Sequence, residues 1–219
     1  MIRWNSNRLF IGVLTIAVSG FLGAAVLLLR GPLPIPLSDG SDWVGIASSA
    51  SFLPYQRLLI VGYVLPFVGF LALYEYLGRD AQGDRASMFG LILLLWGTTL
   101  ALPALGIVSF VASSVSSLGL ADHAVIGEIV TDTVTDSAFS VGIAAAILYS
   151  MGSLLFGVTI WQNASLSKIA AVIFGIHGLL LSFGFSFFPV LILGWLSLGL
   201  SGILLSVDLR RLRADNNSA

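Results

Sequence analysis

The chain has no cysteine and very little charge. Only 10% of its 219 residues are charged, against about a quarter in a typical soluble domain. Without thiols, disulfide scaffolds, thiolate zinc sites, iron–sulfur clusters and cysteine nucleophiles are excluded. So few charges could not cover the surface of a water-exposed globule, and a net charge of −1 provides no basic field for nucleic acid. With 57% hydrophobic residues and a mean hydropathy of +1.00, the composition indicates an integral membrane protein.

The apolar residues form long continuous runs rather than an alternating pattern, which indicates transmembrane helices. We expect one all-α domain over residues 1–219 with six spans, at about 9–29, 58–77, 88–112, 138–161, 169–187 and 190–207. The last two spans share one uncharged run that is too long for a single crossing. Pro189 lies near the middle of that run and predicts a hairpin, while Pro66 and Pro103 predict kinks in the second and third spans.

The basic residues predict the orientation, because cytoplasmic loops retain Lys and Arg. In a six-span topology only Arg30 and Arg57 lie on one side. The other side carries Arg3, Arg8, Arg79, Arg85, Lys168, Arg210, Arg211 and Arg213. We therefore predict that both termini are cytoplasmic and that the protein lies in the cell membrane (inner or cytoplasmic). Anionic lipids there attract the basic tail, so membrane lipids are expected partners.

The segment between the third and fourth spans is acidic. It has no Lys or Arg and contains Asp122, His123, Glu128, Asp132 and Asp136. Apolar residues recur between them at helical spacing, which predicts an amphipathic helix at the outer surface or, alternatively, an outward extension of the fourth span. A cation site is the alternative, but the segment has neither a ligand-loop spacing nor a glycine turn. We predict solvated acids and no metal.

His177 is the one titratable side chain deep within a predicted span, and intramembrane ionisable groups are functional candidates. Matching depths across the preceding connection places it near Ser153 and Tyr149. One interpretation is a neutral imidazole that bonds to either side chain and holds two helices together. A proton or substrate contact is a second interpretation. A haem with Met151 as second axial ligand is the least favoured, and we predict no cofactor.

A second ionisable pair is predicted at a membrane boundary. Glu75 lies near the end of the second span, four residues before Arg79. This spacing places both side chains on one helix face and predicts an interfacial ion pair.

Small residues recur every four positions within four of the spans. These sets are Gly178 with Ser182 and Ser186, Ser153 with Gly157, Ser19 with Gly23, and Ser197 with Ser201. Such ridges let helix backbones approach closely. They predict packing inside the bundle or, alternatively, contacts with other membrane subunits.

Two parts of the chain resemble a known family. The stretches are 70–74 followed by 89–92, and 151–158 followed by 165–172. Both are similar to prokaryotic six-span membrane proteins that are grouped as a domain of unknown function. The family pattern often has Pro and a basic residue before the fifth span, whereas this chain has Leu166, Ser167 and Lys168. The resemblance implies the six-span architecture and no active site.

The sequence lacks several motifs that are typical of enzymes. It lacks a glycine-rich phosphate loop, a His-Glu-x-x-His pair, a Gly-x-Ser-x-Gly elbow and paired intramembrane aspartates. We therefore expect a non-catalytic accessory or scaffold subunit of a membrane complex. The alternative is a small transporter, or a protein that binds a lipid or small molecule in a cavity around His177.

Overall fold

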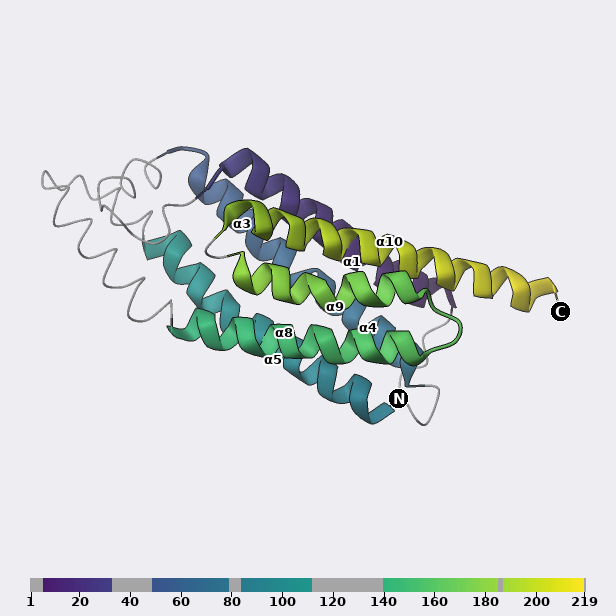
Figure 1. Cartoon of the computed structure of the whole chain (residues 1–219). Coiled ribbons are helices and arrows are strands. Elements are labelled where there is room, and N and C mark those ends of the chain that lie inside the picture. Colours follow the sequence, from purple (N-terminus) through teal and green to yellow (C-terminus); the bar gives the residue numbers. More distant parts are fainter. Residues whose placement is uncertain (1–5, 33–48, 79–83, 112–139, 185–186, 219) are drawn as a thin grey trace, which may run out of the picture.

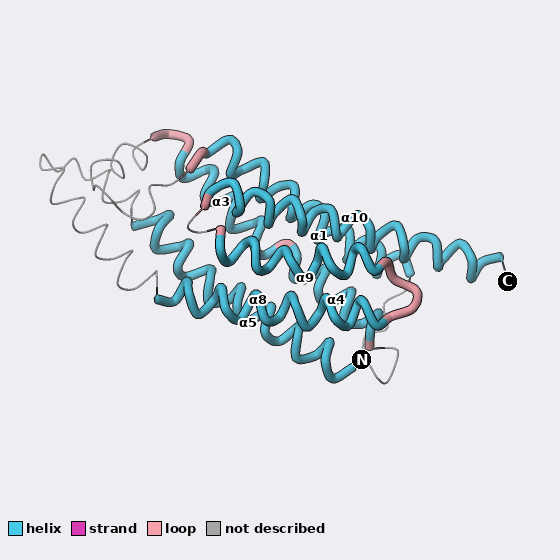
Figure 2. Tube along the Cα trace, viewed as in Figure 1, coloured by secondary structure: helices cyan, strands magenta, loops and turns pink. Residues whose placement is uncertain are grey.

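A computed structural model of the chain describes residues 6–32, 49–78, 84–111, 140–184 and 187–218, which form a bundle of helices (Figures 1 and 2). The elements are α1 (Ser6–Arg30), α3 (Phe52–Val64), α4 (Pro66–Leu77), α5 (Asp84–Gly106), the π-helix η1 (Ile107–Val111), α8 (Ser140–Gln162), α9 (Lys168–Phe183) and α10 (Phe188–Ser218). The described part of the chain contains no strand, so the all-α prediction is confirmed there. The acidic segment with the predicted amphipathic helix lies outside the described residues.

Within the described ranges, five helices are long and apolar enough to cross a membrane. They are Asn7–Arg30, Phe52–Leu77, Arg85–Gly106, Ser140–Gln162 and Phe188–Ala214. The helix that corresponds to the predicted fifth span, α9, is shorter, with 16 residues. It ends at Phe183, and α10 begins five positions later with Pro189 in its first turn. The long uncharged run is therefore divided into two helices near Pro189, as predicted.

The second span begins earlier than the hydropathy pattern suggests. We predicted a start at Leu58, after Gln56 and Arg57, but the helix begins at Phe52. Gln56 is buried on the inner face of α3, whereas Arg57 is exposed, so one helix accommodates both polar side chains. At Pro66, where we predicted a kink, the helix is interrupted at Leu65 and divides into α3 and α4. The helix with Pro103 continues to Gly106 and then into η1.

The helices are arranged as a ring in which each contacts its neighbours. Going round, α1 packs on α10, α10 on α9, α9 on α8 and α8 on α5. The ring is closed by α3 and α4, which pack closely on α1 and only loosely on α5. At its C-terminal end α10 continues past the rest of the bundle (Figure 1).

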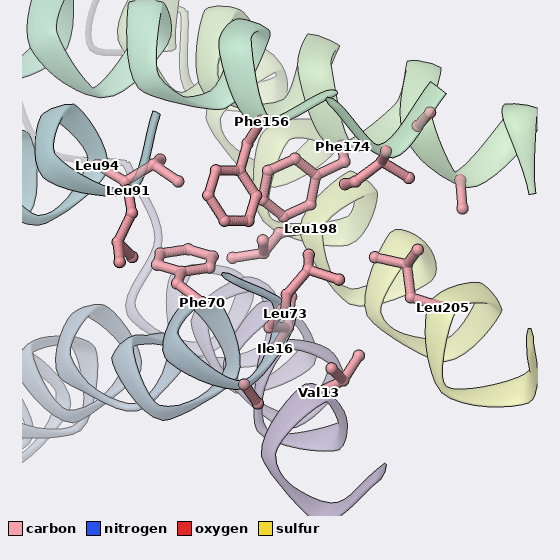
Figure 3. Packing of buried hydrophobic residues seen from close by; sticks show 14 of the residues in the cluster. Val13, Ile16, Phe70, Leu73, Leu91, Leu94, Phe156, Phe174, Leu198 and Leu205 are labelled. Atoms are coloured by element: carbon pink, nitrogen blue, oxygen red, sulfur yellow. The ribbon is translucent and has the colours of Figure 1, made fainter. Parts of the chain in front are cut away.

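The centre of the helix bundle is filled by apolar side chains from several helices. Phe70 of α4, Phe156 of α8 and Phe174 of α9 point toward one another (Figure 3). The ring centroids of Phe70 and Phe156 each lie 5.9 Å from that of Phe174, a separation typical of attractive aromatic pairs. Leu198 of α10 adds a contact from the fourth side, and all four side chains are completely buried.

The outward faces of the helices are apolar too. On α8 the exposed large side chains recur with the helical period: Ile143, Ile147, Met151, Leu154, Val158 and Trp161. Polar side chains such as Ser19, Thr98, Ser153, His177 and Ser201 are buried instead. Apolar surface all round a bundle with polar groups inside is what a lipid environment favours. The fold therefore supports the composition in indicating a membrane protein.

Glycines allow α1 and α10 to pack in close contact. A Cβ added at Gly20 would overlap with the backbone of Gly199, and one added at Gly23 would overlap with the ring of Trp195. The Trp195 side chain is 1% exposed and packs edge-to-face on Tyr63 of α3, with ring centroids 4.8 Å apart. The small-residue ridge of α1 therefore contributes to packing within the bundle.

Candidate functional site

The imidazole of His177 is completely buried between α8 and α9. Its Nδ1 lies against the carbonyl oxygen of Phe174, one turn earlier in α9. A carbonyl can only accept, so Nδ1 carries the proton and Nε2 is the acceptor. The hydroxyl of Tyr149 then donates to Nε2 across the helix interface, with an O···N distance of 3.1 Å. The structure thus selects Tyr149 over Ser153 as the side chain that bonds to His177.

Three serines extend this contact along the same interface. The hydroxyl of Ser153 lies 3.2 Å from the carbonyl oxygen of Gly175 in α9, and that of Ser150 lies 3.1 Å from the carbonyl oxygen of Gly178. In the opposite direction, the Ser182 hydroxyl of α9 reaches the carbonyl oxygen of Ala146 in α8 at 2.9 Å. Each hydroxyl has one proton, and Ser153 and Ser182 share theirs with a carbonyl oxygen of their own helix, at 2.9 and 2.8 Å. Together with the Tyr149–His177 bond, these hydroxyls line the interface between α8 and α9 with polar contacts.

Small residues let the backbones approach closely enough for these bonds. A Cβ at Gly178 would overlap with the Ser153 side chain, and one at Gly157 would lie 3.0 Å from the carbonyl oxygen of Ala171. The predicted ridges on the fourth and fifth spans thus pack against each other within this chain. Ser186, the last member of the fifth-span ridge, lies outside the described residues.

His177 also belongs to the aromatic centre of the bundle. Its ring centroid lies 4.8 Å from that of Phe174 and 5.5 Å from that of Tyr149, both in edge-to-face geometry. Because both ring nitrogens are hydrogen-bonded within the protein, a ligand or metal at Nε2 would first have to displace Tyr149. Met151, which we considered as a second axial ligand with His177, is 50% exposed on the outer face of α8. The structure does not bring these two side chains together.

The other predicted sites fall largely outside the described residues. Glu75 is half-buried near the end of α4, but Arg79 is not described, so the ion pair stays a prediction. The same holds for Asp122, His123, Glu128, Asp132 and Asp136. Among the residues that the structure does describe, no group of three or more His, Asp or Glu side chains could hold a metal ion.

A hydrogen bond that sequence reasoning missed lies at the break between α3 and α4. In a continuous helix, the N–H of residue 66 would bond to the carbonyl of Gly62, but Pro66 has no N–H. The hydroxyl of Ser19 in α1 donates to this carbonyl instead, at 2.6 Å, and Ser19 is completely buried. The local signal was the proline four positions after Gly62, although nothing local identifies Ser19 as the replacement donor.

Two charged side chains complete the ends of α8 and α9. Lys168 donates from Nζ to the carbonyl oxygens of Trp161 and Asn163, where α8 ends. At the start of α9 the carboxylate of Asp208, from α10, accepts from the backbone N–H of Ser167 at 2.7 Å. A cation at a helix C-terminus and an anion at a helix N-terminus both interact favourably with the helix dipoles. This short connection is therefore fixed from both sides.

Comparison with family models, with curated proteins and with solved structures gives no match for this chain. The resemblance to six-span proteins of unknown function therefore stays a prediction.

Proposed function

We propose that the chain crosses the cell membrane six times, with both termini on the cytoplasmic side. The basic residues support this orientation. Among the described residues, Arg30 and Arg57 lie at one end of the bundle, and Arg8, Arg85, Lys168, Arg210, Arg211 and Arg213 lie at the other. In this topology α9 is the fifth span, in addition to the five helices of spanning length. At 1.5 Å per residue it is about 24 Å long, and it lies between two helices that are long enough to cross.

Because the chain has no cysteine, single-cysteine variants test this topology without background. Ser165→Cys lies in the connection before α9, and Phe187→Cys lies in the connection after it; both positions are exposed. If α9 crosses, a membrane-impermeant maleimide added outside intact cells labels Phe187→Cys but labels Ser165→Cys only after permeabilisation. Labelling of both variants from the same side would contradict the six-span proposal.

We propose further that this bundle is a non-catalytic accessory or scaffold subunit of a membrane complex. The observation that carries this proposal is that the polar side chains between α8 and α9, and Ser19 of α1, form hydrogen bonds between helices. Tyr149, His177, Ser150, Ser153 and Ser182 are engaged in bonds between α8 and α9, and Ser19 bonds to α3. Their chemistry serves to hold helices in register around an aromatic centre, as expected of a rigid structural unit.

The outer face of α5 is where we expect the partner subunit. Of the apolar stretch of α5, 28% is buried within the bundle, against 56% of the apolar stretch of α1. This difference arises because α5 packs closely on α8 and only loosely on α3 and α4. Phe89 and Trp96 are exposed on this helix, and aromatic side chains are enriched where protein surfaces meet.

Native mass spectrometry after extraction in mild detergent tests this function. We expect the chain to leave the membrane with a defined partner polypeptide at fixed stoichiometry. The double variant Phe89→Ala/Trp96→Ala should lose that partner. Its matched control, Ile147→Ala/Met151→Ala on the exposed face of α8, should retain it. If the wild-type chain is recovered only as a single polypeptide with lipid, the accessory role is wrong.

A further inference from the structure

The end of the bundle that is poor in basic residues contains a partly buried arginine. Arg30, the last residue of α1, is half-buried. Its Nε donates to the carbonyl oxygen of Gly31 at 3.3 Å, and its Nη1 donates to Oε1 of Gln56 at 3.4 Å. Its other N–H groups have no acceptor among the residues that the structure describes. A guanidinium keeps its charge in proteins, so these donors call for an acceptor.

Gln56 adds a donor that has no partner. The residue is 1% exposed, and its Nε2 makes no hydrogen bond. Exchanging the oxygen and nitrogen of the terminal amide would not give Nε2 a partner, because Nε2 would then face the Arg30 donor. A buried amide N–H without an acceptor is unfavourable. An acceptor close to Arg30 could satisfy both side chains after rotation of the terminal amide.

The packing of the helices places the N-termini of α3 and α10 near Arg30. Gly20 of α1 lies against Gly199 of α10, and Ala17 lies against Gly202, so the two helices run antiparallel. In this antiparallel register, Arg30 lies ten residues beyond Gly20 and is therefore level with Pro189, ten residues before Gly199. Pro189 is in the first turn of α10. Figure 1 shows the end of α1 beside the starts of α3 and α10. Helix N-termini carry partial positive charge and favour anions.

No described carboxylate lies at this end to balance these charges. The described residues there are 24–32, 49–60, 102–111, 140–146, 178–184 and 187–196. They include Arg30 and Arg57 but no Asp or Glu. The charged side chains described at this end are therefore both cations. The starts of α3 and α10 add partial positive charge, while the end of α1 at Arg30 carries partial negative charge.

The depth of this site matches the level of lipid headgroups. The 25 residues of α1 form a helix about 37 Å long, which exceeds the hydrocarbon core of about 30 Å. Arg30 at its end therefore reaches the interfacial layer, where phospholipid phosphates lie.

We propose that Arg30 and Gln56 form an oxyanion site that binds a phosphate or carboxylate group at this end of the bundle. The guanidinium supplies the charge and a planar pair of donors, Gln56 supplies the third donor, and the starts of α3 and α10 favour the negative charge. The oxyanion belongs either to a lipid headgroup or to a free anion.

The test uses the full chain in dodecyl maltoside, a detergent without phosphate. One arm adds phosphatidylglycerol and counts the bound lipid by native mass spectrometry; the other adds inorganic phosphate and follows the Tm. We expect wild-type protein to respond in at least one arm. Arg30→Gln should weaken that binding about tenfold, because it removes charge-assisted hydrogen bonds. The matched control is Arg57→Gln, at the exposed arginine next to Gln56, which should change the affinity less than about twofold.

A second variant keeps the test decisive if Arg30→Gln does not fold. Gln56→Leu retains the cation but removes the unpartnered donor. It should weaken binding about threefold while leaving the Tm of the ligand-free protein unchanged or raised. Binding of phosphatidylglycerol without competition by inorganic phosphate identifies a lipid site, and competition identifies a free-anion site. If neither probe binds, or if Arg30→Gln and Arg57→Gln weaken binding equally, the oxyanion site is wrong.

Discussion

The hydrogen bond from Ser19 to the carbonyl of Gly62 can be tested by two substitutions. One removes the Ser19 hydroxyl, and the other restores the backbone N–H that Pro66 lacks. The carbonyl is free because Pro66 lacks an N–H, and Ser19 donates to it from the neighbouring helix at 2.6 Å. Ser19→Ala leaves this carbonyl without a donor inside the bundle. Pro66→Ala restores an N–H four residues after Gly62. The backbone at Leu65 already has helical angles, with φ −56° and ψ −39°, so the restored N–H is expected to reach the carbonyl.

The magnitude follows from the two environments of the carbonyl. Hydrogen bonds between membrane helices contribute about 0.6 kcal/mol on average and up to about 1.7 kcal/mol. Because Ser19→Ala also leaves a buried acceptor unpaired, we expect a loss near the upper value, about 1.5 kcal/mol. In the Pro66→Ala background the backbone satisfies the acceptor, and the same substitution should cost about 0.5 kcal/mol. The coupling free energy should therefore be about 1 kcal/mol.

This double-mutant cycle requires the free energy of unfolding of the wild type, the two single variants and the double variant. This free energy is measured by titration with sodium dodecyl sulfate in mixed micelles. Ser206→Ala is the matched control, because Ser206 is a buried serine that bonds within its own helix to the carbonyl of Gly202. Its effect should be the same with and without Pro66. If the costs of Ser19→Ala and Pro66→Ala add within about 0.3 kcal/mol, Ser19 does not replace the missing N–H and the reasoning is refuted.

Three other predictions use the same unfolding measurement. Gly23→Ala should lower the free energy of unfolding by about 2 kcal/mol, because its methyl group would overlap with the Trp195 ring. The control Gly142→Ala, whose methyl group would meet open space, should be neutral or stabilising. Equal losses in the two variants would contradict the close packing of α1 on α10. Tyr149→Phe should cost about 1 kcal/mol by leaving Nε2 of His177 without its donor, and an unchanged stability would show that this bond contributes nothing. Asp208→Asn should cost about 0.5 kcal/mol by removing negative charge from the start of α9; this loss should shrink in 1 M salt, and a salt-independent loss would contradict the electrostatic origin.

Local patterns predicted the helices well but some of their ends poorly. The division before Pro66 and the turn near Pro189 were predictable, because a proline restricts its own backbone wherever it occurs. The start at Phe52 was not, because hydropathy treats Gln56 and Arg57 alike, although one is buried and the other exposed. Which side of a helix faces the bundle depends on its neighbours, and a sum over residues does not contain that information.

The sequence by itself indicated a helical membrane protein, because scarce charge follows from the composition and apolar runs of spanning length follow from the order of the residues. It also identified His177 as a titratable side chain deep within a predicted span, and it identified small-residue ridges for close packing. Only the tertiary structure decided that Tyr149 is the partner of His177, that Ser19 serves Gly62, and that Asp208 meets the start of α9. These contacts join residues that are distant in the chain, so they depend on the rotation and register of packed helices. That arrangement results from the fit of many side chains at once and has no local signature.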